Sequence, residues 1–221
     1  MSRKLFKHTL VPKWELSTEY VDGQRYYVLP DGLTKLKSVT TVLGEKLDKT
    51  ALLEWKKRIG EEEANRISKI ATRRGNAIHS IAERYVLNEE RYYAPNEMPV
   101  NVDSFMPIKA ALDEHVDNIL GVELPLWSKA LGCAGRTDLV AQYNGVTSII
   151  DFKTSKRLKK TEWIESYFLQ STIYSMMFER LYSIAVPQIV IIITVDDDPV
   201  CQKFIMNRAD YVNRAIEVLS L

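Results

Sequence analysis

Alternating and helical patterns of apolar residues divide the first 120 residues into a short hairpin and a helix-rich stretch. Residues 19–21 and 25–28 flank Asp22-Gly23, a dipeptide typical of a tight turn, and predict the hairpin. Ser38 suits the N-cap of a following helix, and Gly60 suits the end of the next. Helical spacing of apolar residues predicts helices over residues 39–43, 51–59, 62–87 and 105–119.

Strand patterns dominate from about residue 121 onward. Alternating and wholly apolar segments predict strands over 122–127, 135–143, 146–153, 188–195 and 201–206. Helical spacing of apolar residues predicts helices over 161–182 and 209–219. The 188–195 segment is almost wholly apolar, as in a sheet that helices cover on both faces. We therefore expect an α/β (α+β) fold with a central mixed β-sheet flanked by helices. No repeat or linker divides the chain, so we expect one domain over 1–221, with a hairpin and a helical roof in 1–120 and the sheet with its helices in 121–221.

Composition narrows the cellular setting and the cofactor classes. The 221 residues are 46% hydrophobic, and no apolar run reaches the roughly 20 residues of a membrane-spanning helix. We therefore expect a soluble, intracellular protein without a membrane partner. The first fourteen residues are basic and free of acids, so a mitochondrial transit peptide stays an alternative. Only Cys133 and Cys201 are present, which predicts buried free thiols and excludes a four-cysteine zinc or iron–sulfur site within one chain.

The net charge limits where a nucleic acid could bind, and missing motifs argue against several enzyme classes. Thirty basic and 29 acidic residues give a net charge of +1, so any surface for a nucleic acid must be local. The sequence has no Gly-x-Ser-x-Gly elbow, its three histidines are distant from both cysteines, and it has no phosphate-binding glycine loop. These absences argue against serine and cysteine hydrolases and against nucleotide-binding enzymes.

An acidic residue two positions before a lysine occurs twice, about as often as chance predicts for this composition. Glu54 and Lys56 lie in a polar helical pattern, which favours a solvated surface. Asp151 instead ends an apolar strand, where a buried carboxylate needs a charged partner or a metal ion. Strand alternation puts Asp151 and Lys153 on the same side.

Asp138 precedes Asp151 by 13 residues with a hairpin turn between them, so the two carboxylates can face each other across neighbouring strands. Hard oxygen ligands of this kind suit Mg²⁺ or Mn²⁺. Lys153 would then orient or help deprotonate the attacking water and balance developing negative charge. A structural Asp–Lys ion pair at the end of the sheet is the alternative that the residues alone leave open.

Several motifs follow one another along the chain in a specific order. The downstream motifs are Gly135-x-x-Asp138, Asp151-x-Lys153-Thr154 and Gln170-x-x-x-Tyr174. The upstream ones are Ser38-Val39-Thr40-Thr41-Val42-Leu43, Trp55 and Gly75-x-x-x-His79-x-x-x-Glu83. Each motif is weak alone, but the ordered set resembles the RecB-type branch of the PD-(D/E)XK nucleases. Within that branch it is similar to the mitochondrial genome maintenance exonuclease and its bacteriophage relatives.

The resemblance implies a metal-dependent DNA exonuclease that degrades single-stranded DNA from its ends, in replication, repair or recombination. Its setting would be the cytoplasm of a bacterium or of a phage-infected host. Mg²⁺ or Mn²⁺ would be held by His79, Asp138, Asp151 and the backbone carbonyl of Phe152, with Lys153 as the catalytic lysine. Gln170 and Tyr174 would contact the active site or a DNA phosphate. The four cysteines of the iron–sulfur members are absent, so no cluster is expected.

Residues around this core admit two interpretations each. Glu123 is either a further metal ligand or a surface acid. Glu83 shares a helical face with Gly75 and His79, so it could orient the imidazole while Gly75 allows close backbone approach. A lone helical histidine is also often structural, and Gln170 and Tyr174 could equally serve helix packing.

Basic and aromatic residues near the motifs are candidates for DNA contacts. The candidates for contacts to the DNA backbone are Arg73, Arg74, Lys156, Arg157, Lys159 and Lys160, although a charge run of this kind is more often only solvated. Stacking on bases is an option for Trp163, Tyr167 and Phe168, although core packing suits most of them better. A duplex or structure-specific endonuclease and a catalytically inactive DNA-binding module are the competing functions. An unidentified replication or recombination protein is a partner to consider.

Overall fold

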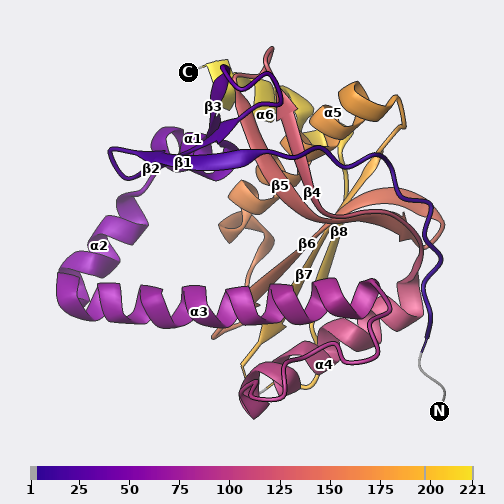
Figure 1. Cartoon of the computed structure of the whole chain (residues 1–221). Coiled ribbons are helices and arrows are strands. Elements are labelled where there is room, and N and C mark those ends of the chain that lie inside the picture. Colours follow the sequence, from indigo (N-terminus) through magenta and orange to yellow (C-terminus); the bar gives the residue numbers. More distant parts are fainter. Residues whose placement is uncertain (1–3, 197, 221) are drawn as a thin grey trace.

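The computed structural model describes residues 4–196 and 198–220 (Figure 1), so the first three residues of the basic N-terminal segment lie outside it. The strands are β1 (Ser17–Val21), β2 (Gln24–Val28), β3 (Lys35–Ser38), β4 (Val116–Ser128), β5 (Cys133–Tyr143), β6 (Val146–Ser155), β7 (Gln188–Val195) and β8 (Gln202–Asn207). The helices are α1 (Val39–Lys46), α2 (Thr50–Ile59), α3 (Glu61–Val86), α4 (Pro99–His115), the 3₁₀ turn η1 (Thr161–Trp163), α5 (Glu165–Tyr182) and α6 (Ala209–Ser220). Within the described ranges no helix has the length and apolarity needed to cross a membrane. Cys133 and Cys201 are free and buried, as expected.

All eight strands join in one mixed sheet. Along one path the order is β1-β2-β3-β5-β6-β7-β8, and β4 pairs with the other edge of β5. The β3–β5 and β6–β7 pairs are parallel, and the other pairs are antiparallel. The expected mixed sheet flanked by helices is therefore confirmed. One expectation is corrected: β3, which the sequence did not predict, joins the opening hairpin to the same sheet, so residues 1–120 are more than a roof over it.

The sheet forks along one edge of β5. The first residues of β5 pair with β3, and the β5–β6 ladder begins only at Leu139↔Ile150. One position earlier, the Asp138 carboxylate replaces the next backbone pairing: its Oδ2 accepts the N–H of Phe152 at 2.8 Å. The two strands therefore separate beside Asp138, which leaves this side chain at the mouth of the fork.

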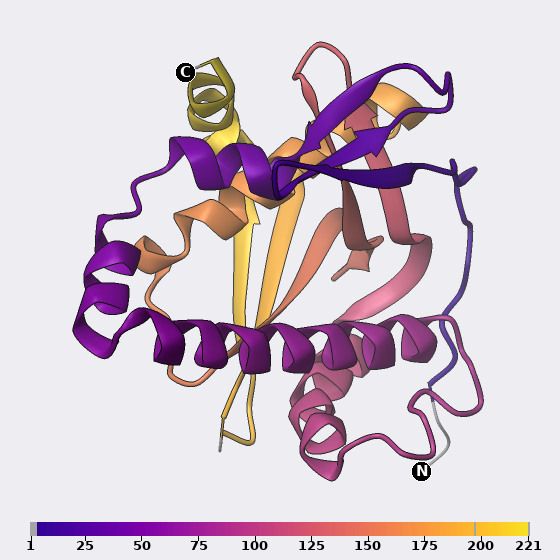
Figure 2. The same cartoon turned by 60° about the vertical axis from the view of Figure 1, so that its left-hand side comes forward.

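Helices cover both faces of the sheet (Figures 1 and 2). One face packs against α1, α5 and α6, and the other packs against α3 and α4. In β7, Ile189, Ile191 and Ile193 point to the first layer, while Val190 and Ile192 point to the second, as strand alternation requires. The prediction that this strand is buried on both faces is confirmed.

Local signals explain several element ends. The Ser38 side chain accepts the N–H of the third residue of α1 at 3.0 Å, which confirms the predicted N-cap. The helix predicted over 105–119 is displaced, because α4 begins at Pro99 and β4 begins at Val116. Pro99 suits a first helical turn, where no backbone N–H is needed. Ile119 therefore lies in a strand.

Helix α2 and the first half of α3 project beyond the sheet (Figures 1 and 2). We call α2 and residues 61–77 the arm. α2 has no buried residue, and α3 buries only Ala64 before Ile78. Gly60 joins the two helices directly at φ 85° and ψ 152°, a conformation almost confined to glycine. The apolar stripe predicted for the long helix thus packs only in its second half, and Ile70 is exposed.

Candidate metal centre and its cavity

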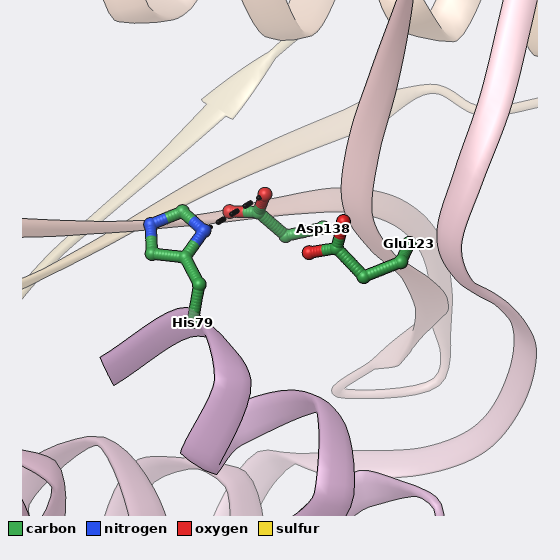
Figure 3. Close-up of side chains that lie close together, drawn as sticks. All are labelled: His79, Glu123 and Asp138. Carbon is green, nitrogen blue, oxygen red and sulfur yellow. Dashed lines mark ion pairs between the residues drawn. The ribbon is translucent and has the colours of Figure 1, made fainter. Parts of the chain in front are cut away.

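Three side chains from three elements meet at the sheet fork (Figure 3). His79 comes from α3, Glu123 from β4 and Asp138 from β5, and one ligand atom from each lies within 4.8 Å of the other two. No second group of three such residues is found in the part of the chain that the structure describes. Two carboxylates and an imidazole at this separation form a donor set that suits a divalent cation.

The β4–β5 register places Glu123 beside Asp138. Val122 pairs with Leu139, so the next residue of β4 lies opposite the preceding residue of β5. Glu123 has φ 44°, a left-handed conformation that is uncommon for a non-glycine residue. Strain of this kind persists where the surrounding structure imposes it, and it gathers at functional sites.

His79 and Asp138 form an ion pair, with Nδ1 3.2 Å from Oδ1. Burial alone would lower the pKa of His79, but the charge and hydrogen bond of Asp138 raise it to about 9. Burial alone would raise the pKa of Asp138, but His79 and Lys153 hold it below its usual range. The imidazolium therefore balances the charge of Asp138 when no metal ion is bound.

Glu123 lacks a partner of comparable strength. Burial and the neighbouring charge of Asp138 raise the pKa of Glu123 to about 7. Its ion pair with Arg136 is long, with 3.8 Å between Nη1 and Oε2. Two carboxylates that repel each other in this way gain most from a cation between them, so His79, Glu123 and Asp138 fit a divalent metal ion.

A buried ion pair lies on β6 beside this cluster. Lys153 Nζ is 2.5 Å from Oδ2 of Asp151, which is 3% exposed, and the Tyr167 ring centroid lies 5.1 Å from the ammonium. Burial alone would lower the pKa of Lys153, but Asp151 and Asp138 raise it. Burial raises the pKa of Asp151 against the opposing effect of Lys153. The structural Asp–Lys ion pair, which the sequence left open as an alternative, is therefore present. The Asp151 carboxylate points to Lys153 and lies outside the three-residue cluster.

Gly135 makes room for Tyr174 of α5. A Cβ atom at position 135 would lie 2.6 Å from both Cε1 and the hydroxyl of Tyr174. Gln170, one turn earlier, donates from Nε2 to that hydroxyl at 3.4 Å, and both side chains line the cavity over the cluster. Burial raises the pKa of Tyr174, so its hydroxyl stays protonated. The Gly-x-x-Asp and Gln-x-x-x-Tyr motifs therefore contact each other, through Gly135 of the first and Tyr174 of the second.

The cluster lies in a cavity of about 620 Å³ with walls from the β1–β2 hairpin and from α3. Sequence reasoning missed seven of its lining residues, which are Thr18, Tyr20, Arg25, Tyr27, Asn76, Ser80 and Arg136. Arg136 could have been found, because strand alternation puts it on the same side as Asp138. The hairpin residues carry no such signal, since only the β3–β5 pairing brings them to the site.

Two residues of the α3 motif differ from their expected contacts. Glu83 lines the same cavity, but the Nδ1 atom of His79 is paired with Asp138. A Cβ atom at Gly75 would have no heavy atom within 4 Å. The expected close backbone approach at Gly75 is therefore wrong.

The candidate DNA-binding cations occupy two regions. Arg73 is exposed on α3, whereas Arg74 forms an ion pair with Asp196 and donates to Ser104 Oγ at 3.0 Å, so its charge is largely compensated. The segment between β6 and η1, outside the described lining of the cavity, carries Lys156, Arg157, Lys159 and Lys160. Contacts of these residues with DNA stay predictions.

The three candidate stacking residues have different environments. Phe168 is 1% exposed in the core, as the packing interpretation required, and Tyr167 lies over the Lys153 ammonium. Trp163 is 61% exposed, and the Lys160 ammonium lies 5.2 Å from its ring centroid. Among the three, the exposed face of Trp163 is the one open to a base.

Comparison with known proteins identifies the family of this chain. No curated protein matches it. The family model described as PD-(D/E)XK nuclease superfamily matches residues 34–197, more than half of the chain. This range contains the three-residue cluster and the Asp151–Lys153 pair. The chain belongs to the PD-(D/E)XK nuclease superfamily.

Proposed function

We propose that the protein is a divalent-metal-dependent deoxyribonuclease of the RecB-type branch that hydrolyses single-stranded DNA from its ends. The observation that carries this proposal is the His79–Glu123–Asp138 cluster beside the buried Asp151–Lys153 pair at one fork. The Phe152 N–H links the two parts, because it donates to Asp138. Hard carboxylate oxygens favour Mg²⁺ or Mn²⁺, with the Phe152 carbonyl and Asp151 as further candidate ligands.

A bound Mg²⁺ or Mn²⁺ ion would polarise a phosphate oxygen and make the attacking water more acidic. The chain's own cations act around that centre. Arg25 and Arg136 line the cavity, from which they hold phosphate oxygens. Lys153 stays protonated beside Asp151, so it stabilises the negative charge of the transition state and does not remove a proton from water.

The walls of the cavity support a single-stranded substrate. Tyr20 and Arg25 of the hairpin lie on one side, and Asn76 and His79 of α3 lie on the other. A cavity of about 620 Å³ admits a flexible strand of unpaired nucleotides. A duplex roughly 20 Å across would have to displace one wall.

The setting we propose is replication, repair or recombination, where single-stranded ends arise. The RecB-type motif order supports this assignment, as it supports the cytoplasm of a bacterium or phage-infected host. A replication or recombination protein is the expected partner.

The test incubates the protein with end-labelled, linear single-stranded DNA in Mg²⁺ or in EDTA. We expect cleavage in Mg²⁺ only, and a loss of at least roughly 100-fold in Asp138→Asn and Asp151→Asn, because each substitution removes a carboxylate that would hold the metal ion. Asp117→Asn is the matched control, since Asp117 is exposed on β4, and it keeps the wild-type rate. Cleavage in EDTA, or wild-type rates in both site variants, would refute the metal-dependent nuclease.

The same assay compares the linear strand with a covalently closed circle and with blunt duplex DNA. We expect degradation of the linear strand and at least roughly tenfold slower cleavage of the other two, because both lack a free single-stranded end to enter the cavity. Equal rates on strand and circle would establish an endonuclease. Binding without cleavage of any of the three would establish a catalytically inactive binding module.

A further inference from the structure

A second hollow lies on the arm, between α3 and the beginning of α4. Its volume is about 360 Å³. Three exposed apolar side chains contribute to its lining: Ile70 is 53%, Met98 59% and Val100 52% exposed. Ile70 precedes His79 by about two and a half helical turns, so the two side chains point to opposite sides of α3. Apolar residues gathered in one hollow, unlike scattered ones, indicate a binding site.

Cations surround this apolar floor. Arg66, Lys69, Arg73 and Arg74 line the hollow. Arg66 pairs with Glu63, and Arg74 pairs with Asp196. Lys69 and Arg73 form no ion pair with any other described residue, so they leave the rim positively charged. The hollow therefore suits a ligand that combines a flat apolar part with a negative charge.

A depression on α3 connects the hollow with the cavity around the metal centre, although the two lie on different sides of the helix. This depression shares Lys69 and Arg73 with the hollow and shares Asn76 with the cavity around His79. Arg73 and His79 are separated by roughly 9 Å along the helix axis, from a rise of about 1.5 Å per residue. A strand that leaves the metal centre past Asn76 would thus reach Lys69 and Arg73 next.

We propose that this hollow is a subsite for one unstacked base of the DNA strand, with the flanking phosphates against Lys69 and Arg73. The proposal rests on the proposed function, and it adds a contact beyond the metal centre. A base offers an apolar face to Ile70, Met98 and Val100, and arginine guanidinium groups stack on bases while they bind phosphate. An uncharged apolar peptide would leave the cationic rim without a partner, so charge favours the nucleotide.

The test uses single-stranded oligonucleotides with one 2-aminopurine, placed at successive positions from the end, in EDTA. Ile70→Gln removes apolar surface from the hollow, and Ile216→Gln makes the same change at an exposed isoleucine of α6. We expect Ile70→Gln to raise the Kd roughly tenfold, because it removes apolar surface that the base would cover, and Ile216→Gln to leave it unchanged. Wild type and Ile216→Gln should show increased fluorescence at one oligonucleotide position, and Ile70→Gln should lose that increase.

Equal Kd values and equal fluorescence profiles for the two variants would overturn the base subsite and leave the hollow to an apolar protein partner. Cleavage of the same oligonucleotide by wild type in Mg²⁺ is measured in parallel, which separates the two proposals. Wild-type cleavage without an Ile70 effect refutes the subsite alone. An Ile70 effect on binding without cleavage refutes the nuclease and retains the subsite. If wild type does not bind the oligonucleotide at all, the base subsite is refuted.

Discussion

His79 and Asp138 form the contact that balances charge in the metal-free centre. The imidazole is protonated there because Asp138 raises its pKa to about 9. A metal ligand must be the neutral imidazole, so metal binding at this centre releases a proton. The same histidine therefore links the stability of the metal-free protein to pH.

We predict that the stabilisation contributed by His79 in EDTA is full below pH 6.5 and is lost as pH rises towards 9. The sign follows from the raised pKa, because the folded protein binds the proton more tightly than the unfolded chain does. The free energy of unfolding of wild type, relative to His79→Gln, should fall by on the order of 2 kcal/mol over this range. Urea denaturation at steps of pH measures it. A constant difference between the two proteins would contradict the His79–Asp138 coupling.

Residue types and spacing predicted the candidate chemistry only in part. Strand alternation correctly placed Asp151 and Lys153 on one side, where they pair. Spacing alone could not separate the two interpretations of Glu123, because its place beside Asp138 depends on the β4–β5 register and a left-handed backbone. Spacing also could not predict the separation of β5 and β6 at the fork. There Asp151 pairs with Lys153, and Asp138 pairs with His79.

At the scale of elements, the approach of α5 to β5 depends on one missing side chain. We predict that Gly135→Ala lowers the free energy of unfolding by about 1–3 kcal/mol, because the added methyl group overlaps buried Tyr174. Displacement of Tyr174 and Gln170 should also lower the cleavage rate. Thermal unfolding and the end-labelled assay measure the two effects.

Gly75→Ala is the matched control for this substitution. Gly75 lies inside α3 with nothing near its missing Cβ, so alanine should raise stability by about 0.5–1 kcal/mol through lower chain entropy. If Gly135→Ala were equally benign, the close α5–β5 contact would not exist in solution.

Elements with strong local patterns were predictable, and those defined by distant partners were not. The wholly apolar strand β7 was predicted at 188–195, its observed bounds. The helical phase of Ile119 was misleading, because the chain enters β4 at Val116. β3 is short and largely polar, and it is a strand only through partners on both sides, so its own sequence carries little signal.

At the scale of the whole molecule, β1 is weakly attached. β3 joins β5 through two residue pairs, Lys37↔Cys133 and Ser38↔Ala134, and every residue of β1 is exposed. We predict that the amides of β1 exchange with solvent at least roughly tenfold faster than those of β5 to β7, because no residue of β1 is buried, whereas Tyr27 and Val28 of β2 are. Hydrogen exchange followed by mass spectrometry measures this. Equal protection would mean that the hairpin wall of the cavity is as fixed as the sheet.

The arm contributes almost nothing to either core, since α2 buries no residue and α3 buries only Ala64 before Ile78. In evolutionary terms, this separates two kinds of selection. Selection removes substitutions in β5 to β7 mainly when they destabilise the fold. Exposed substitutions in the arm change stability little, so selection acts on them through the ligand that the arm contacts. Under the proposed function, the arm is therefore where relatives of this nuclease can diverge in substrate handling while the catalytic fork stays intact, and where an engineer would begin.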